Sequence, residues 1–215
     1  MRPNIDKYKF IIFDFDGVIV DSLGVKTEAF GQLFSSYGRD IALKVKQYHL
    51  NNGGISRYEK FKYYYKSLLN KKINKSITRR LDKKYSDLVL TRVASAAYIK
   101  GALEFIKKCN KDKKSCFIIS ATPEKELRRI VKLKKIQPLF KIVLGSPKNK
   151  SDNLKYLLKK FSINSADVVY FGDAVSDFQA AKNNRICFIG IVNKKSRELK
   201  GIKGRPTIRD FTCFG

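Results

Sequence analysis

Two aspartates that directly follow an apolar run are the first residues of this 215-residue chain that could do chemistry. The stretch FIIFDFDGVIVDS starts at Phe10 and carries Asp14 and Asp16 on either side of Phe15, with Gly17 next. A short apolar run of this kind is typical of a buried parallel strand, and Asp and Gly are poor strand formers that should end it. Ligands bind at the carboxyl ends of strands in open α/β sheets. The two carboxylates are therefore candidates for a site rather than for an ordinary acidic turn.

Other polar groups that suit one site follow later apolar runs of the chain. CFII is followed by Ser120, and IVL is followed by GSPKNKSDN, which contains Lys148 and Lys150. The run VVYF is followed by a Gly-Asp-x-x-x-Asp motif that contains Asp173 and Asp177. If each run is a strand of one parallel sheet, all of these side chains lie at the same edge.

Together, these four motifs resemble those of the haloacid dehalogenase superfamily of phosphohydrolases, and the resemblance covers the whole chain. It implies that Asp14 is the nucleophile and a Mg²⁺ ligand, and that the backbone carbonyl of Asp16 also binds Mg²⁺. The Asp16 side chain would protonate the leaving oxygen and then activate water, which requires a second carboxyl close to the nucleophile. Asp173 would bind the metal directly, and Asp177 would hold a metal-bound water or orient the site.

The same resemblance assigns the phosphate-binding residues. Ser120 and the backbone N–H groups of Ala121 and Thr122 would bond the phosphoryl oxygens. Lys150 is preferred to Lys148 as the motif lysine, because it directly precedes Ser151, the expected N-cap of the next helix. The lysine-proline pair of the more common family form is absent here, so the choice between the two lysines stays open.

Magnesium is the expected cofactor for a physical reason as well. A carboxylate nucleophile and a phosphate repel each other, and Mg²⁺ prefers oxygen ligands. Clustered acids without a cation would raise one another's pKa values and destabilise the fold. The clustering of the motif aspartates therefore favours a bound divalent metal.

The pattern of apolar residues divides the chain into an α/β part and a helical part. After the first strand, residues 23–95 show helical spacing, whereas strands and helices alternate from residue 96 onward. We expect a Rossmann-like parallel-sheet core from residues 1–22 and 96–215, with an all-helical cap at residues 23–95. Thr122 and Pro123 should open a helix as N-cap and first-turn residues. The helical spacing is set by Phe30, Leu33, Phe34 and Tyr37, by Tyr58, Phe61, Tyr65, Leu68 and Leu69, and by Ile77, Leu81, Tyr85 and Leu88.

The insertion resembles the mobile caps of phosphoglycolate phosphatases and β-phosphoglucomutases, which close over the site and carry selectivity. The loop from His49 to Arg57 stands where such caps carry a substrate-contacting loop. Arg57 could hold a second anionic group of the substrate, or it could be an ordinary solvated arginine. His49, the one histidine of the chain, is expected on the surface, with a substrate contact as the alternative. Phosphonatase activity is disfavoured, because it needs a cap lysine near the nucleophile and no lysine of the insertion stands in a recognisable context for that role.

The formal net charge of +27 is large, but the basic residues are spread over nearly every predicted helix. Nucleic acid is therefore an improbable physiological substrate, although small phosphorylated anions should be attracted.

The cysteines form no CxxC pair or zinc set, and no apolar run is long enough to span a membrane. We expect no signal peptide, because the sequence MRPNIDKYKF leads directly into the first predicted strand. A cytoplasmic monomer is the default expectation.

The preferred function is a Mg²⁺-dependent phosphatase that hydrolyses a small phosphorylated metabolite through an aspartyl-phosphate. One alternative is a phosphotransferase of the β-phosphoglucomutase kind, because water access under the closed cap decides between the two. Another is a basic nucleic-acid-binding protein with end-phosphatase activity. Dehalogenase activity is disfavoured, because the dehalogenases of this superfamily lack the acid–base aspartate that Asp16 supplies.

Overall fold

A parallel β-sheet forms the centre of the protein in a computed structural model, which describes residues 3–192, 199 and 205–214. Among the described residues the sheet has six strands in the order β3-β2-β1-β4-β5-β6, and all neighbouring pairs are parallel. The strands are β1 (Phe10–Phe13), β2 (Ser115–Pro123), β3 (Ile142–Ser146), β4 (Val168–Gly172), β5 (Cys187–Ile191) and β6 (Thr207–Ile208). This topology confirms the expected Rossmann-like α/β core.

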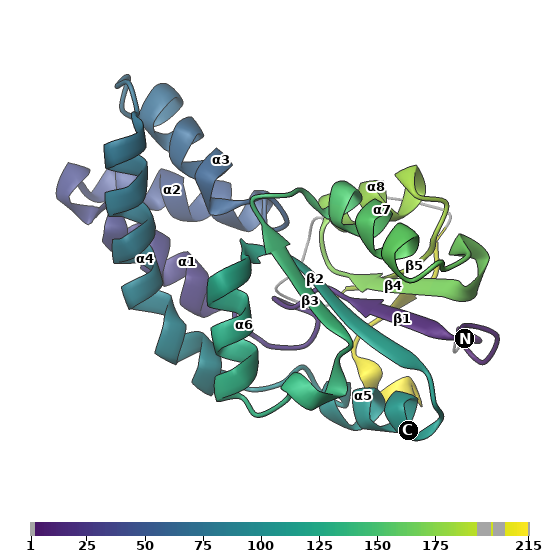
Figure 1. The fold of residues 1–215 in the computed structure, drawn as a ribbon. Helices are drawn as coiled ribbons and strands as arrows, with labels where there is room; N and C mark the ends of the chain where they lie inside the picture. Colours follow the sequence, from purple (N-terminus) through teal and green to yellow (C-terminus); the bar gives the residue numbers. More distant parts are fainter. Residues whose placement is uncertain (1–2, 193–198, 200–204, 215) are drawn as a thin grey trace.

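Helices cover both faces of the sheet, so the core has three layers (Figure 1). One face is covered by α7 and α8 and the other by α5 and α6. The buried side chains accordingly form two clusters that the sheet separates. These helices are α5 (Ala102–Lys111), α6 (Glu124–Leu133), α7 (Lys150–Lys160) and α8 (Val175–Asn183).

The central strand β1 is buried on both faces, which explains its unbroken apolar run. Ile11 and Phe13 point into the cluster on the side of α5, whereas Ile12 points into the cluster on the side of α7. Phe13 stacks on Phe171 of β4 with 5.5 Å between ring centroids. Burying each such side chain stabilises the fold by about 1.5–3 kcal/mol. The strand that carries Asp14 at its end is therefore held firmly in place.

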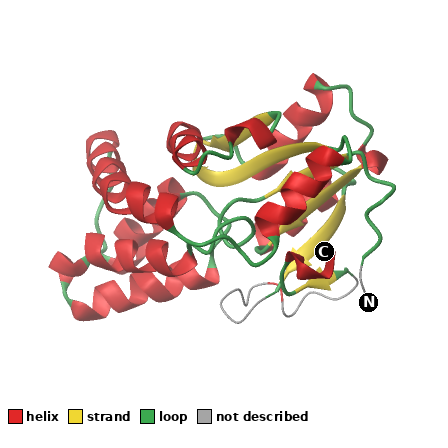
Figure 2. Cartoon of the chain, turned by 90° about the horizontal axis from the view of Figure 1, so that it is seen from below, coloured by secondary structure: helices red, strands yellow, loops and turns green. Residues whose placement is uncertain are grey.

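Residues between β1 and α5 form a separate group of helices beyond the carboxyl ends of the strands (Figures 1 and 2). Its helices are α1 (Leu23–Leu33), α2 (Arg39–Asn51), α3 (Arg57–Tyr63) and α4 (Lys75–Ser95). None of the described helices is long and apolar enough to cross a membrane.

Aromatic side chains form the interior of this helical group. Phe30 packs on Tyr85 with 4.2 Å between ring centroids, and Phe34 meets Tyr64 edge-on at 5.1 Å. Tyr64 and Tyr65 are buried. These two tyrosines therefore pack between helices.

The start of α7 differs from the sequence prediction. The helix begins at Lys150, and Asn149 is its N-cap, because the Asn149 side chain accepts a hydrogen bond from the N–H of Asp152 at 2.8 Å. The prediction that Ser151 caps this helix was wrong. Asn and Ser are both good N-cap residues, so their order in the sequence alone does not decide between them.

Candidate active site

Two carboxylates and one lysine meet where β1 ends. The Lys150 ammonium donates to Asp14 Oδ2 at 2.7 Å and to Asp177 Oδ1 at 2.6 Å. All three side chains are buried. They come from β1, α7 and α8, so the fold unites residues that lie 136 positions apart in the sequence.

Asp177 is fixed by two further groups. The Tyr170 hydroxyl, which projects from β4, donates to Asp177 Oδ1, and the backbone N–H of Ala174 donates to Oδ2 at 3.1 Å. A Cβ at Gly172 would lie 2.3 Å from the Asp177 Cβ, so only glycine fits there. The glycine of the Gly-Asp-x-x-x-Asp motif thus gives the second aspartate its room.

Asp173 completes a group of carboxylates that fits a metal ion. Asp14, Asp173 and Asp177 each offer an oxygen within 4.8 Å of the others. Gly17, at φ 77°, lets the loop after β1 approach Asp173, because a Cβ there would lie 2.0 Å from Asp173 Oδ2. Three closely spaced carboxylates form an all-oxygen donor set, which is the kind that Mg²⁺ binds.

The charge state of Asp14 also favours a cation at this site. Burial, together with the negative charges of Asp177 and Asp16, raises the pKa of Asp14 to about 7, although Lys150 opposes the shift. Burial alone would lower the pKa of Lys150, but Asp14 and Asp177 raise it above its ordinary value, so the lysine stays protonated. A divalent cation beside Asp14 would favour its ionised form.

The second carboxylate, Asp16, has a different set of partners. It accepts hydrogen bonds from Ser22 Oγ at 2.5 Å, Lys26 Nζ at 2.5 Å and Thr122 Oγ1 at 2.9 Å. Burial raises the pKa of Asp16, but the charge of Lys26 and the hydrogen bonds from Lys26, Ser22 and Thr122 together outweigh burial, and the pKa is lowered. Because the Thr122 hydroxyl is used here, it does not cap α6, which begins at Glu124. The N-cap prediction for Thr122 was wrong.

The expected phosphate-binding residues lie around the same point. Ser120 is buried at the end of the regular pairing of β2, and its Oγ accepts from the N–H of Thr122 at 3.2 Å. Ser120 and Ala121 line the cavity that also contains Asp14. Lys148 lies elsewhere, with its Nζ 4.9 Å from the centre of the Tyr156 ring. Of the two candidate lysines, it is Lys150 that contacts Asp14.

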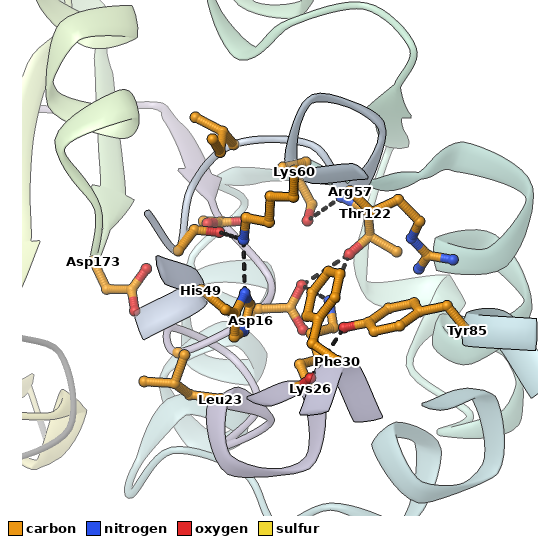
Figure 3. Close-up of a pocket in the computed structure, with 16 residues that line it drawn as sticks. Asp16, Leu23, Lys26, Phe30, His49, Arg57, Lys60, Tyr85, Thr122 and Asp173 are labelled. Atoms are coloured by element: carbon orange, nitrogen blue, oxygen red, sulfur yellow. Dashed lines mark hydrogen bonds and ion pairs between the residues drawn. The ribbon is translucent and has the colours of Figure 1, made fainter. Parts of the chain in front are cut away.

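A small cavity of about 50 Å³ separates the strand ends from the helical insertion (Figure 3). A water needs roughly 10–15 Å³ on this measure, so the cavity has room for about four waters. From the core it is lined by Asp14, Asp16, Gly17, Ser120, Ala121, Thr122 and Asp173, and from the insertion by Leu23, Lys26, Phe30, His49, Gly53, Ile55, Arg57, Lys60 and Tyr85.

The insertion closes over this cavity through its loop before α3. The Ser176 hydroxyl of α8 donates to the Gly54 carbonyl at 2.9 Å. A Cβ at Gly54 would lie 2.6 Å from the Ala174 Cβ, so glycine permits this close approach. The loop that the sequence suggested as a substrate contact therefore touches the core segment that carries the Gly-Asp-x-x-x-Asp motif.

Arg57 lies in the cavity wall, but its guanidinium is bound to other protein groups. It forms a buried ion pair with both carboxylate oxygens of Glu126 in α6. It also donates to Ser86 Oγ at 2.8 Å and Asp82 Oδ1 at 3.2 Å, and it lies over the Tyr85 ring at 4.5 Å. Arg57 is therefore not the solvated arginine that was one of its two sequence-based alternatives. It joins the insertion to the core.

Weakening this junction should lower stability in a measurable way. Glu126→Gln removes the charge that Arg57 binds, and a buried hydrogen bond to a charged group is worth about 1.5–3 kcal/mol. We expect Tm to fall by roughly 3–12 °C, measured by thermal unfolding. Glu59→Gln is the matched control, because the Glu59–Lys62 pair is exposed on both sides and such pairs contribute little. Equal Tm values for the two variants would contradict the role of this junction.

His49 and two lysines show where sequence reasoning failed. His49 is buried, with 3% exposure, so its expected surface position was wrong. Lys26 and Lys60 were not predicted at all, yet both line the cavity. A signal existed for Lys60, which lies three residues after Arg57 and so shares its helix face. Lys26 similarly lies one helical turn after Ser22, which contacts Asp16.

Several solved structures are similar to the protein in fold. A predicted phosphoglycolate phosphatase from Haemophilus somnus 129pt has 16% identity and a TM-score of 0.75, with 98% of each chain covered. β-Phosphoglucomutase from Clostridium difficile has 18% identity and a TM-score of 0.77, with 95% of this chain and 92% of that chain covered. CbbY from Rhodobacter sphaeroides, solved as a mutant with xylulose-(1,5)bisphosphate, has 14% identity, a TM-score of 0.76 and 95% coverage of both chains.

These likenesses show a shared fold, and no curated protein sequence matches the chain. The family is shown by a sequence model for haloacid dehalogenase-like hydrolases, which matches residues 11–191. That range contains every carboxylate, serine and lysine of the site described above. The chain therefore belongs to the family of haloacid dehalogenase-like hydrolases, and it is an enzyme of that family.

Proposed function

We propose that the protein is a Mg²⁺-dependent phosphatase that hydrolyses a small phosphorylated metabolite through an aspartyl-phosphate on Asp14. The observation that carries the proposal is the buried contact of Lys150 with Asp14 and Asp177 beside Asp173, at the end of β1. A nucleophilic carboxylate needs cations around it before it can approach a phosphate, and this site supplies a lysine and three carboxylates that fit a metal ion.

Each residue of the site has a role in the proposed reaction. Asp14 attacks the phosphorus while Ser120 and Lys150 hold the phosphoryl oxygens. Asp16 gives a proton to the leaving oxygen and later takes one from the attacking water. The contact with Lys26 lowers the pKa of Asp16, so the closed insertion favours the ionised form that the water step needs.

Mg²⁺ would be held by Asp14, Asp173 and the backbone carbonyl of Asp16, with Asp177 in support. When bound, it supplies positive charge that offsets the repulsion between carboxylate and phosphate. Within this proposal the residues 23–95 act as a cap that excludes water from the site, because their side chains form one wall of the cavity.

The four cysteines are free, which is usual in a reducing compartment and supports a cytoplasmic location.

Metal removal should abolish activity. Chelation is expected to stop phosphate release, and Mg²⁺ should restore it better than Ca²⁺. Ca²⁺ takes more ligands at longer distances and in a looser geometry, so it would hold Asp14 less precisely. The measurement is phosphate release in chelator, followed by titration with each metal. Full turnover in chelator, or a better rate with Ca²⁺, is incompatible with the proposed site.

A panel of phosphorylated compounds tests the substrate class. It should contain phosphoglycolate, sugar phosphates and bisphosphates, nucleotides and DNA ends, each with and without Mg²⁺. The proposal predicts free phosphate from small esters, because core and insertion both line the cavity, and they could not close over a polynucleotide in this way. Formation of an isomeric sugar phosphate without phosphate release would support the mutase alternative. Phosphate release from DNA ends alone would support the nucleic-acid alternative.

A further inference from the structure

One end of the helical insertion is strongly basic. Between residues 66 and 84, eight of nineteen residues are Lys or Arg and only Asp82 is acidic, whereas the whole chain has 46 Lys and Arg against 19 Asp and Glu. The segment runs from the end of a π-helix (Tyr64–Leu68) through a loop into the first half of α4. This loop lies at an outer end of the insertion, away from the sheet (Figure 1).

Most of these cations have no carboxylate partner. All eight are exposed. Lys83 pairs with Asp87 at 2.9 Å, and Asp82 is bound by Arg57 at 3.2 Å. The other seven form no ion pair with any carboxylate of the described residues. We call these seven the basic tip: Lys66, Lys71, Lys72, Lys75, Arg79, Arg80 and Lys84.

The basic tip brings like charges close together. On α4, Lys75 and Arg79 are four residues apart, as are Arg80 and Lys84, so each pair lies on one face about 6 Å apart along the helix axis. Like charges at this spacing destabilise a helix, and no carboxylate of the described residues pairs with these four cations to offset the repulsion. An external polyanion would offset it, so charge complementarity indicates a polyanionic partner.

The composition of the segment distinguishes among polyanions. Helices that bind membrane surfaces also bury an apolar face in the lipid, but none of the exposed large apolar side chains of the described residues lies between 66 and 84. Proteins that bind single strands stack bases on aromatic rings, and this segment contains no Phe, Tyr or Trp. Contact with phosphates alone remains, and double-stranded nucleic acid presents them densely, with one charge per about 1.7 Å of axis.

The basic tip is separate from the catalytic cavity. None of its seven residues lines that cavity. Tyr85, which directly follows Lys84, is buried and does line it. One side of α4 therefore faces the cavity while another side carries cations of the tip, so a polyanion on the tip would leave the cavity free for a small ester.

We infer that the basic tip docks the protein on the phosphate backbone of double-stranded nucleic acid without reading its sequence. Nucleic acid is in this inference a docking partner, and the substrate remains a small ester. The inference goes beyond the proposed phosphatase function and does not depend on it.

The test compares two triple variants that lose the same charge. The tip variant carries Lys72→Gln, Lys75→Gln and Arg79→Gln. The control variant changes three exposed lysines of the core helices α5, α7 and α8 that form no ion pair among the described residues: Lys107→Gln, Lys155→Gln and Lys182→Gln. Fluorescence anisotropy would measure the binding of each protein to two unrelated DNA duplexes of about 20 base pairs, between about 50 and 200 mM salt.

The unsubstituted protein should bind both duplexes equally well. Each lost phosphate contact should cost about eightfold in affinity at about 0.1 M salt and reduce the steepness of log K against log salt by about 0.9. The tip variant should therefore bind about 10²–10³-fold more weakly, whereas the control variant should lose less than about tenfold. Equal losses in the two variants would show that the net charge of +27 attracts DNA from all sides, and would refute the docking surface.

Other polyanions test the choice of partner. A single strand of the same length, and vesicles of phosphatidylcholine with phosphatidylserine, should each bind more weakly than the duplex at the same salt. Tighter binding to either would overturn the assignment to double-stranded nucleic acid. A duplex Kd above about 10⁻⁴ M for the unsubstituted protein would refute docking altogether.

Activity and stability separate the docking surface from the catalytic site. The tip variant should keep the Tm of the unsubstituted protein and its kcat on any ester that it hydrolyses, because the three changed side chains are exposed and lie outside the cavity. A loss of kcat in parallel with DNA binding would contradict the separation of the two sites. Failure of the unsubstituted protein to hydrolyse any monophosphate with Mg²⁺ would instead refute the proposed function, and the difference between the two variants in DNA binding would still support docking.

Discussion

Asp14→Asn is expected to reduce kcat by at least about 10⁴-fold, because an amide cannot attack phosphorus and nothing else replaces the nucleophile. Asn has nearly the same shape, and the Phe15 N–H that bonds Asp14 Oδ1 at 2.6 Å can still find an oxygen. The measurement is phosphate release by the pure variant, with circular dichroism to show that it is folded. Asp87→Asn, an exposed aspartate paired with Lys83, is the control and should be fully active. Turnover by Asp14→Asn within tenfold of the unsubstituted protein would contradict the assignment.

The same substitution tests the charge state of Asp14 without metal. Its folded pKa of about 7 lies above its ordinary value of 3.8, so the folded state binds the proton more tightly than the unfolded state does. This stabilising contribution is fully present below about pH 4 and is lost as pH rises to about 7. In chelator, the unfolding free energy of the unsubstituted protein should therefore fall relative to Asp14→Asn over this range. Denaturant unfolding at several pH values measures the difference, and a difference that does not change with pH would contradict the raised pKa.

Lys150→Met should have the second-largest effect, and it should affect both stability and turnover. Removing the lysine leaves Asp14 and Asp177 buried without their shared cation, and breaking a buried ion pair costs about 3–5 kcal/mol. Turnover should fall by about 10²–10³-fold, as when one group that stabilises the transition-state charge is lost. Mg²⁺ should restore much of the stability but not the turnover, because the metal replaces the charge near the carboxylates but not the contact with phosphate.

Lys148→Met is the control for that experiment. Lys148 is exposed and lies over the Tyr156 ring, so its loss should change Tm and turnover little. Unfolding in chelator and in Mg²⁺, together with kcat on one good substrate, separates the two lysines. If Lys148→Met is the more damaging change, the motif lysine has been assigned two residues too late in the sequence.

Much of the site could be predicted because its residues follow directly from strands. An apolar run identifies a buried strand, and the residue after it lies at the carboxyl edge of the sheet whatever the rest of the chain does. Asp14, Ser120 and Asp173 were found in this way. The helical spacing of residues 23–95 depends only on local periodicity, and it likewise corresponds to helices in the structure.

The partners of the insertion could not be predicted, because they depend on how it packs against the core. Arg57 meets Glu126 across 69 residues of sequence, and Lys26 meets Thr122 across 96. No periodicity within α1 or α3 shows that these cations are buried. The burial of His49 depends instead on packing within the insertion, since Phe30 of another helix covers its ring at 4.8 Å.

The central claim is that the phosphoryl group is carried by Asp14, and trapping the phosphorylated protein tests it most directly. Asp16→Asn should still form this species from a substrate whose leaving group needs no protonation, such as acetyl phosphate, and should hydrolyse it slowly, because the group that activates water is missing. The variant would be mixed with ³²P-labelled substrate and Mg²⁺, quenched in acid, and reduced with borohydride, which converts an aspartyl-phosphate to homoserine. The account predicts stoichiometric label that hydroxylamine removes, and homoserine at position 14 by peptide mass spectrometry. Label on any other residue, or turnover by the unsubstituted protein without any phosphorylated Asp14, would contradict it.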